Sequence, residues 1–248
     1  MDFEIKPRSR IQSPTSIAAA TEADYQGKPA GYFEDCRPEM LPFVPTPCQR
    51  LLDVGCGSGA FGALLKSKRS VEVWGIEPFE PAAVKARAQL DRVFRSAFPP
   101  DVELPRAAFD CVIFNDVLEH IIDPAAAIQC ARTLLTATGV VVASIPNIRH
   151  FPTVWHLTMH GRWTYRDCGT LDRTHLRFFT KDSIVAIFQA CGYEVVRIVG
   201  IRPFQGVPNA SRRAWWIYRL ANALTLGRFG DMKFERFAVV AKPARNKP

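Results

Sequence analysis

The sequence lacks the features of membrane-spanning, disulfide-stapled and fibrous proteins. No apolar run approaches the roughly 20 residues that a membrane span requires, and the first residues hold acids in place of the apolar core of a secretion signal. The seven cysteines contain no CxxC pair, which favours reduced packing residues over a disulfide framework or a zinc site. The 15 glycines and 19 prolines follow no period, so a collagen-like fibre is excluded. A reducing compartment suits this chain, and we expect a cytoplasmic protein.

Long runs of like charge are also missing. Lys and Arg (32) outnumber Asp and Glu (24), but the net charge of +8 is spread thinly, which favours an ordinary solvated surface over a nucleic-acid footprint. Hydrophobic residues make up 48% of the 248 positions, and 17 residues are Phe, so the chain can bury a core. One globular domain is the simplest expectation.

Hydrophobic patterning divides the chain into an N-terminal arm and one α/β domain. Residues 1–30 show no helical or strand period and predict a mobile arm, while residues 31–248 predict the folded domain. Strands are predicted at 50–54, 71–77, 109–115 and 139–145, and helices at 60–68, 81–89 and 124–135. The strands are apolar on both faces, as in Cys111-Val112-Ile113-Phe114, which predicts a parallel sheet covered by helices on both sides.

The C-terminal part resumes this alternation after an irregular stretch from Pro146 to Arg177. A helix then begins with Thr180 as its N-cap and ends before Gly192. Two further strands are predicted at 193–201 and 235–242, with a helix at 211–226 between them.

The predicted helix 211–226 is aromatic and basic. Trp216, Ile217, Leu220 and Leu224 share an arc of the helix, which Arg213 interrupts. The arc indicates either packing in a core or lid, or contact with an acceptor or a membrane surface.

A glycine-rich turn follows the first predicted strand. Gly55, Gly57 and Ala60 match the G-x-G-x-x-A spacing of dinucleotide-binding loops, so an enzyme that uses a nicotinamide or flavin is one candidate. Asp53 beside the turn argues against it, because a carboxylate about 6 Å from a phosphate charge costs roughly 3 kcal/mol at an effective dielectric constant of about 20. The same carboxylate favours S-adenosylmethionine, which carries an ammonium and a sulfonium group and no phosphate.

Glu77 lies at the end of the next predicted strand. A carboxylate there can accept hydrogen bonds from both hydroxyls of an adenosine ribose. Nicotinamide cofactors and S-adenosylmethionine both contain that ribose, so Glu77 does not discriminate between them. The structural alternative is a solvated acid that caps the helix beginning at Pro81.

Three sequence blocks together resemble a known enzyme family. They are Leu-Asp-Val-Gly-Cys-Gly-Ser-Gly at 52–59, Gly-Ile-Glu-Pro at 75–78, and Phe-Asp-Cys-Val-Ile-Phe-Asn-Asp-Val-Leu-Glu-His at 109–120. This combination is similar to the class I S-adenosylmethionine-dependent methyltransferases. Segments at 144–147, 161–163 and 171–180 resemble bacterial methyltransferases associated with surface-polysaccharide assembly and, more loosely, ubiquinone-biosynthesis O-methyltransferases.

The resemblance implies a Rossmann-like seven-stranded methyltransferase sheet, mostly parallel, with an antiparallel last strand at 235–242 and helices on both faces. It also implies S-adenosylmethionine as the cofactor, held by Asp53, Gly55, Cys56, Gly57, Glu77, Pro78, Asn115 and Asp116. One position departs from the family pattern. Many relatives place an acid after the third strand to hold the adenine amino group, whereas this chain has Arg95-Ser96-Ala97-Phe98, so Ser96 or a backbone carbonyl is expected in that role.

Asp116, Glu119 and His120 are spaced i, i+3 and i+4, which on a helix places three ligand-capable side chains on one face. The set predicts either a divalent metal site that lowers the pKa of an acceptor hydroxyl, or His120 as a general base. A structural alternative is a capping box, with Asp116 as N-cap, Glu119 at the third helical position and His120 packed beneath.

The remaining histidines lie in the irregular stretch, which in this family covers the acceptor side. His175 is the first candidate for a general base or an acceptor hydrogen bond, with Asp172 orienting its ring, and His150 is the second. For each of them a packed or surface imidazole is the structural alternative. We therefore predict that residues 146–178 form an acceptor-side cap.

These features predict an S-adenosylmethionine-dependent methyltransferase that O-methylates a small molecule or a sugar, such as a surface-polysaccharide precursor. An RNA methyltransferase is a rival that draws on the +8 charge, but Ile145-Pro146-Asn147 lacks the Asn/Asp-Pro-Pro-aromatic loop of enzymes that methylate base amino groups. An NAD-linked oxidoreductase on the same loop and a non-catalytic partner-binding module are the other rivals. Nucleic acid and a transmembrane segment are not expected, whereas peripheral membrane contact and the oligomeric state stay open.

Overall fold

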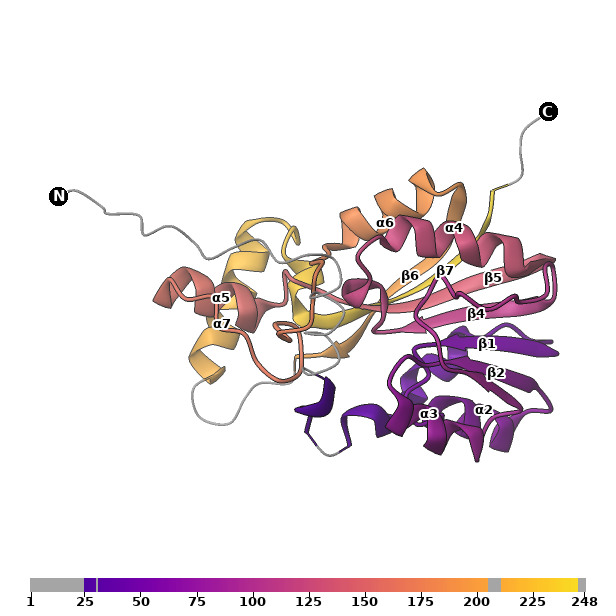
Figure 1. Cartoon of the computed structure of the whole chain (residues 1–248). Coiled ribbons are helices and arrows are strands. Elements are labelled where there is room, and N and C mark those ends of the chain that lie inside the picture. The colour runs from indigo at the N-terminus through magenta and orange to yellow at the C-terminus, as the bar shows by residue number, and fades with distance from the viewer. Residues whose placement is uncertain (1–24, 30, 205–210, 245–248) are drawn as a thin grey trace, which may run out of the picture.

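A single seven-stranded sheet organises the computed structural model, which describes residues 25–29, 31–204 and 211–244. The strands are β1 (Arg50–Val54), β2 (Glu72–Ile76), β3 (Arg92–Phe94), β4 (Phe109–Asn115), β5 (Leu135–Pro146), β6 (Tyr193–Pro203) and β7 (Phe234–Pro243). Their order is β3-β2-β1-β4-β5-β7-β6, and β7 runs antiparallel to both of its neighbours (Figure 1). The predicted sheet with an antiparallel last strand is confirmed.

Helices cover both faces of this sheet (Figure 1). The short 3-10 helix η2 (Pro38–Phe43), α2 (Ala60–Lys68) and α3 (Glu80–Arg87) lie on one face, and α4 (Pro124–Leu134) and α6 (Lys181–Ala190) lie on the other. Neighbouring residues of β1 point to opposite layers: Leu51 packs with Leu65 of α2, whereas Leu52 packs with Ile128 of α4. Burial on both sides explains why the central strands are apolar at successive positions.

The strand and helix boundaries agree closely with the sequence patterns. The N-cap of α6 is Thr180, as the sequence predicts, and its side chain accepts a hydrogen bond from the Ser183 amide in a capping box. Gly192 after this helix has a φ of 77°, a left-handed conformation that glycine adopts at little cost. The strand β5 is longer than expected and begins at Leu135 instead of Gly139.

The prediction of an irregular stretch from Pro146 to Arg177 is wrong in part, because helix α5 (Phe151–His160) lies within it. Pro152 falls in the first turn of α5, where the missing amide hydrogen costs nothing. Val154 and Trp155 lie one turn beyond Phe151 and pack with it in a small apolar cluster. The partner that makes this face apolar is α7, which is distant in sequence.

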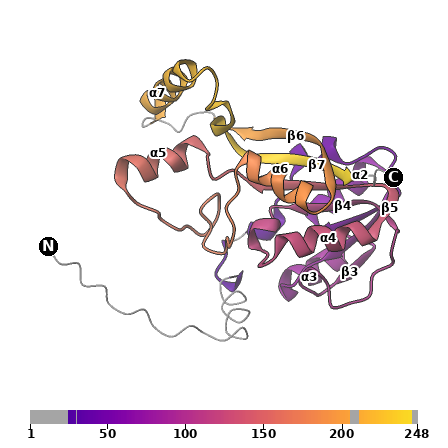
Figure 2. The ribbon, with the colours of Figure 1, turned by 90° about the horizontal axis from the view of Figure 1, so that it is seen from above.

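Helix α7 (Ser211–Leu224) forms a lobe with α5 that projects from the sheet (Figures 1 and 2). The contact is built from Phe151 on α5, Tyr218 on α7 and Met232 just before β7, and the Phe151 and Tyr218 rings are 5.2 Å apart. Within the described ranges, no helix is both long enough and apolar enough to cross a bilayer.

Most of the predicted N-terminal arm, residues 1–24 and residue 30, lies outside the described residues. The described part of it, residues 25–29, contacts the loop that carries Asp172. The Lys28 ammonium donates to the Asp172 carboxylate and, at 3.2 Å, to the Thr174 hydroxyl. This part of the arm therefore belongs to the folded domain.

The packing of α6 generates a stability prediction. Phe188 is fully buried between α6 and the sheet, with its ring 6.0 Å from that of Tyr193. We expect Phe188→Ala to lower the free energy of unfolding in urea by about 3–5 kcal/mol, because it leaves a cavity. The matched substitution Val84→Ala, on α3 at a side chain that is 54% exposed, should change it by less than about 0.5 kcal/mol. Equal effects of the two changes would contradict this description of the core.

Candidate functional site

A cavity of about 990 Å³ lies at the carboxyl ends of β1, β2 and β4. Its volume is near the top of the range of roughly 300–1,000 Å³ that small-molecule sites span, so it can hold a cofactor together with a second molecule. All eight residues predicted to contact a cofactor line it: Asp53, Gly55, Cys56, Gly57, Glu77, Pro78, Asn115 and Asp116. The cavity therefore lies where ligands bind in open α/β sheets.

The turn between β1 and α2 requires glycine at two of its positions. Gly55 and Gly57 have φ angles of 66° and 55°. A Cβ atom on Gly55 would lie 2.6 Å from the Val117 side chain, and one on Gly57 would lie 2.7 Å from the Phe33 carbonyl oxygen. The two glycines thus allow other parts of the protein to pack closely against the turn, and they also leave the turn exposed to the cavity.

The backbone amides of this turn already have acceptors in the protein. Gly55 and Cys56 donate to the Ile76 carbonyl (2.8 and 3.1 Å), Gly57 to Glu77 Oε2 (2.9 Å), Ser58 to the Phe33 carbonyl (2.9 Å) and Gly59 to the Cys56 carbonyl (2.9 Å). A dinucleotide loop works by offering such amides to a pyrophosphate. Because all five are engaged, this turn offers no donors to a phosphate.

Unpartnered acceptors, in contrast, lie beside the turn. Asp53 is 1% exposed, and neither of its carboxylate oxygens has a hydrogen-bond partner among the described residues. Burial, and next the negative charge of Glu77, raise the pKa of Asp53 to about 8. The amide group of Asn115 is also buried, and neither its oxygen nor its nitrogen has a partner in the described part of the chain. A ligand with a positively charged group would supply what Asp53 lacks.

Glu77 is held in place by two backbone amides. Its two carboxylate oxygens accept hydrogen bonds from Gly57 and Phe79, each at 2.9 Å. Each carboxylate oxygen can accept a second hydrogen bond, so the side chain can still bind two hydroxyl groups of a ligand. Burial raises the pKa of Glu77 despite these two hydrogen bonds. The alternative role, a solvated helix cap, is wrong, since the side chain is 5% exposed and Phe79 is the N-cap of α3.

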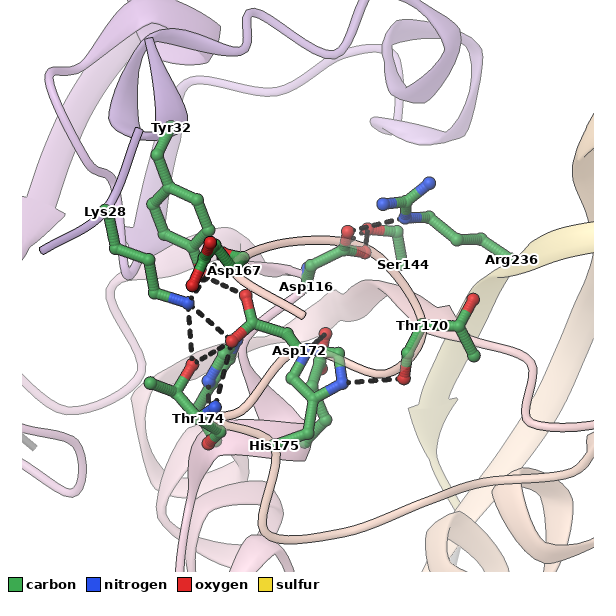
Figure 3. Close-up of polar contacts among 12 residues, drawn as sticks. Lys28, Tyr32, Asp116, Ser144, Asp167, Thr170, Asp172, Thr174, His175 and Arg236 are labelled. Atoms are coloured by element: carbon green, nitrogen blue, oxygen red, sulfur yellow. Dashed lines mark hydrogen bonds and ion pairs between the residues drawn. The ribbon is translucent and has the colours of Figure 1, made fainter. Parts of the chain in front are cut away.

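Asp116 is bound by two arginines, of which Figure 3 shows Arg236. Its Oδ2 lies 2.7 Å from Nη1 of Arg37 and 2.6 Å from Nε of Arg236, and its Oδ1 accepts from the Ser144 hydroxyl at 2.6 Å. Burial opposes ionisation, but Arg236 and Arg37 outweigh it and hold the pKa of Asp116 below its ordinary value. The network ties η2, β4, β5 and β7 together at one side of the cavity.

This arrangement corrects the predicted roles of Asp116. It has a φ of 53°, outside any helix, and the 3-10 helix η3 (Leu118–His120) that follows begins after Val117 without a side-chain cap. The predicted capping box is therefore absent from this segment. Asp116 also does not share a helical face with Glu119 and His120, and its two arginine partners compete with any cation.

Glu119, His120 and His175 come together instead. Nε2 of His175 lies 3.8 Å from Oε1 of Glu119, and the two imidazole rings are 4.7 Å apart. Ligand-capable atoms of the three residues all lie within 4.8 Å of one another. Neither carboxylate oxygen of Glu119 has a hydrogen-bond partner in the described ranges, and burial, followed by the charge of Asp116, raises its pKa.

The tautomer of each histidine follows from its backbone partner. Nδ1 of His120 lies 3.2 Å from the Thr174 carbonyl, and Nδ1 of His175 lies 3.1 Å from the Thr170 carbonyl. A carbonyl only accepts, so Nδ1 carries the hydrogen and Nε2 keeps its lone pair. Burial lowers the pKa of His120 to about 4 and also lowers that of His175, so both rings are neutral at neutral pH.

The predicted role of Asp172 in orienting the His175 ring is wrong, since the Thr170 carbonyl does this (Figure 3). The Asp172 carboxylate is 1% exposed and binds Lys28, the amide and hydroxyl of Thr174 (2.9 and 2.7 Å), and the Tyr32 hydroxyl (3.3 Å). Asp172 thereby fastens the N-terminal segment onto the loop that presents His175.

His150 is not among the residues that line the cavity in the described part of the chain. It precedes α5, and its ring lies 6.0 Å from that of Phe204. Burial lowers the pKa of His150 to about 4. Its structural alternative, a packed imidazole, describes this position better than a catalytic role does.

Sequence patterns do not reveal several residues that build the site. Arg37 lies in a segment without period, Lys28 lies in the predicted arm, and neither gives a signal. Arg236 does give a signal, because it is a charged residue directly before the apolar run of the last strand. In the structure this side chain is only 7% exposed. At the other end of the cavity, the predicted Ser96 lines the wall, and its hydroxyl donates to Asp101 at 2.5 Å.

Comparison with known proteins relates this site to one family. A family model described as a methyltransferase domain matches residues 21–198. An uncharacterized methyltransferase of Mycobacterium bovis is 32% identical over 136 residues, which are 52% of this chain and 65% of that protein. A ubiquinone biosynthesis O-methyltransferase of Cereibacter sphaeroides is 28% identical over 191 residues, which are 72% of this chain and 71% of that protein.

Solved structures share the fold at low sequence identity. A methyltransferase from Burkholderia thailandensis, solved with 1,6-didemethyltoxoflavin and S-adenosylhomocysteine, superposes with a TM-score of 0.60 at 13% identity and covers 96% of this chain and 94% of its own. A methyltransferase from Archaeoglobus fulgidus superposes with a TM-score of 0.59 at 19% identity over 82% of this chain and 90% of its own. Since the family model matches well over half of the 248 residues, and the fold and the cavity agree with it, the chain belongs to the class I S-adenosylmethionine-dependent methyltransferases.

Proposed function

We propose that this methyltransferase methylates a hydroxyl oxygen of a small, ring-bearing molecule, with His120 as the general base. The observation that carries the proposal is the pair of neutral imidazoles beside the cofactor residues, each with its Nδ1 hydrogen given to a carbonyl. A hydroxyl acceptor must lose a proton, and a neutral Nε2 can take it.

The residues of the cavity support binding of S-adenosylmethionine. Its ammonium would give Asp53 the partner that this buried carboxylate lacks, and its ribose hydroxyls would bind Glu77. Ser96, and the Asp101 carboxylate behind it, replace the acid that many relatives use near the adenine. Asn115, which also lines the cavity, is a further buried group without a partner among the described residues.

Aromatic rings line the cavity from the residues beside Glu77 to His120. Phe33 and Phe79 stack at 5.0 Å, and the Tyr25 ring lies 6.2 and 6.4 Å from them. Residues 146–178 act as the acceptor-side cap, since Cys168 and His175 of this stretch line the cavity. Such a wall favours a flat ring over an open-chain acceptor.

Of the two histidines, His120 is better suited to act as the base. His175 is 8% exposed and its Nε2 faces Glu119, so we assign it a positioning role. His120 is partly exposed and lies next to the aromatic wall, with its ring 6.4 Å from Tyr25. This assignment reverses the order expected from the sequence.

When bound, S-adenosylmethionine supplies an electrophilic methyl group, and its transfer leaves neutral S-adenosylhomocysteine. The acceptor oxygen forms the new bond to carbon while His120 Nε2 takes the hydroxyl proton. The Thr174 carbonyl stabilises the resulting imidazolium through the Nδ1 hydrogen.

A divalent ion is the second candidate for activating the hydroxyl, and the cluster of Glu119, His120 and His175 fits it. Both histidines hold their Nδ1 hydrogens on carbonyls, an arrangement common in metal-binding histidines. An ion there would keep Glu119 ionised and lower the pKa of an acceptor hydroxyl. Asp116 would not take part, because two arginines bind it.

The rivals are less well supported. The engaged amides of the glycine turn disfavour NAD, and the thinly spread positive charge disfavours a nucleic-acid acceptor. Incubation with methyl-labelled S-adenosylmethionine and separate panels of phenols, sugars and total RNA tests the proposal. We expect label in the phenol panel. Label in RNA alone, or in the sugars alone, would contradict the ring-bearing acceptor.

The unpaired state of Asp53 predicts opposite effects on stability and binding. Its folded-state pKa is raised to about 8, so the stability that Asp53 contributes is complete at low pH and is lost as pH rises from about 4 towards 8. At pH 8, ligand-free Asp53→Asn should be at least about 1 kcal/mol more stable than the native chain in urea unfolding.

The same Asp53→Asn variant should bind S-adenosylmethionine at least about tenfold more weakly in isothermal titration. Asp182→Asn, at an exposed acid on α6 that does not line the cavity, is the matched control and should leave the affinity for S-adenosylmethionine unchanged. A destabilised Asp53→Asn variant at pH 8, or one with native affinity, would refute the assigned role.

The histidine assignment predicts a split between rate and binding. His120→Gln should lower kcat by about 10²–10⁴-fold while S-adenosylmethionine affinity stays unchanged. His160→Gln, at an exposed histidine at the end of α5, should change neither value. The pKa of His120 near 4 implies that the activity of the native enzyme stays level between about pH 6 and 8.

A chelator distinguishes the base from the ion. Enzyme treated with EDTA should keep full activity under the general-base proposal. Loss of activity that is restored by a divalent ion would assign the cluster of Glu119, His120 and His175 to metal binding instead.

A further inference from the structure

The outward face of α7 is apolar and uncovered. Trp216 is 65% exposed, Leu220 62% and Leu224 75%, while Ile217 beside them is 45% exposed. The opposite side of the helix packs into the lobe, where Tyr218 is 4% exposed and donates to the Phe229 carbonyl. Helix α7 therefore packs into the lobe through one side and exposes large apolar side chains to solvent on the other, where a surface helix normally carries polar residues.

These exposed side chains share one arc of the helix, which Arg213 interrupts by its position in the sequence. Positions 216, 220 and 224 are each one turn apart, and Ile217 lies at the edge of the same arc, one turn before 220 and two turns before 224. From Trp215 onward, the part of α7 whose side chains are described places no charged residue within that arc. Arg219 borders it, with its guanidinium 5.1 Å from the centre of the Trp216 ring.

The segments that carry α5 and α7 are without acids, although Asp231, just after the second of them, pairs with Arg149 at 3.4 Å. Residues 147–166, which include α5, and residues 211–230, which include α7, contain no Asp or Glu. The same segments contain the arginines Arg149, Arg162, Arg166, Arg212, Arg213, Arg219 and Arg228. Such one-sided charge next to an apolar face complements an anionic surface with an apolar interior.

We propose that α7 docks this chain on the surface of an anionic phospholipid bilayer. The helix lies flat, with Trp216, Leu220 and Leu224 in the acyl boundary and with Arg219 and Arg228 at the level of the headgroups. With 14 residues α7 is too short to span a bilayer, which takes about 20 residues, so it lies on the surface.

Other occupants fit this face less well. A dimer interface of ordinary size takes about 20–30 residues from each partner, whereas this arc offers a few side chains of one helix. RNA would meet aliphatic side chains at Ile217, Leu220 and Leu224, which cannot stack with bases. The bilayer satisfies both the aliphatic arc and the surrounding positive charge.

The lobe of α5 and α7 is connected to strand ends that line the cavity. Helix α5 follows β5, and α7 lies between β6 and β7, whose residues Arg202 and Arg236 line the cavity wall. Docking through α7 would therefore hold the cavity close to the bilayer. The inference depends on the α7 face alone, and it holds whichever atom the enzyme methylates.

Flotation of the full chain with lipid vesicles tests the proposal. One set of vesicles contains phosphatidylcholine alone, and the other contains phosphatidylcholine and phosphatidylglycerol in equal parts. We expect flotation with the anionic vesicles, weakened at high salt. Leu220→Glu should reduce binding at least about tenfold, because it places a charge in the acyl boundary.

Val84→Glu is the matched control, since Val84 on α3 is 54% exposed and lies far from α7 in the fold. It should float as the native chain does. Circular dichroism of both variants verifies that they fold. Absence of flotation, or equal flotation of Leu220→Glu and the native chain, would overturn the proposal. So would a dimer that Leu220→Glu converts to a monomer, or RNA binding that this substitution abolishes.

Discussion

A buried carboxylate without a partner is the constraint on which the rest of the site depends. Asp53 lies at the end of β1, beside a turn whose backbone amides all donate to acceptors within the protein. The turn therefore gives a ligand close contact without giving it donors, and the carboxylate demands a cation. This combination separates a methyl-donor site from a dinucleotide site, although both use the same glycine spacing. The raised pKa of Asp53 expresses the cost of leaving it unpaired.

A second charged group of the site is fully satisfied. Asp116 has two arginines and a serine hydroxyl, which fix the end of β4 against η2 and β7. Its left-handed backbone turns the chain towards η3, which carries Glu119 and His120. Asp53 and Asp116 therefore differ in role. Asp53 has no partner among the described residues, whereas Asp116 fixes the backbone that leads to Glu119 and His120.

The sequence was most informative where burial dictates the pattern. Strands covered on both faces and a helix with a capping box at Thr180 have local signals, and the structure agrees with them. The sequence did not predict helix α5, because its apolar face packs against α7, a helix distant in sequence, and the local pattern shows no helical period. The charge spacing of Asp116, Glu119 and His120 misled for a related reason. Helical spacing brings side chains together only on a helix. Asp116 lies outside one and binds Arg37 and Arg236, which come from opposite ends of the chain.

The central claim is that Asp53 is left unpaired to receive the positive charge of the methyl donor. Carbon-13 NMR of the Asp53 carboxyl group, titrated against pH with and without S-adenosylmethionine, measures this directly. The account predicts a pKa near 8 in the ligand-free protein, and a fall to well below neutral when the donor binds. A pKa that is ordinary in the free protein, or that the donor leaves unchanged, would contradict it.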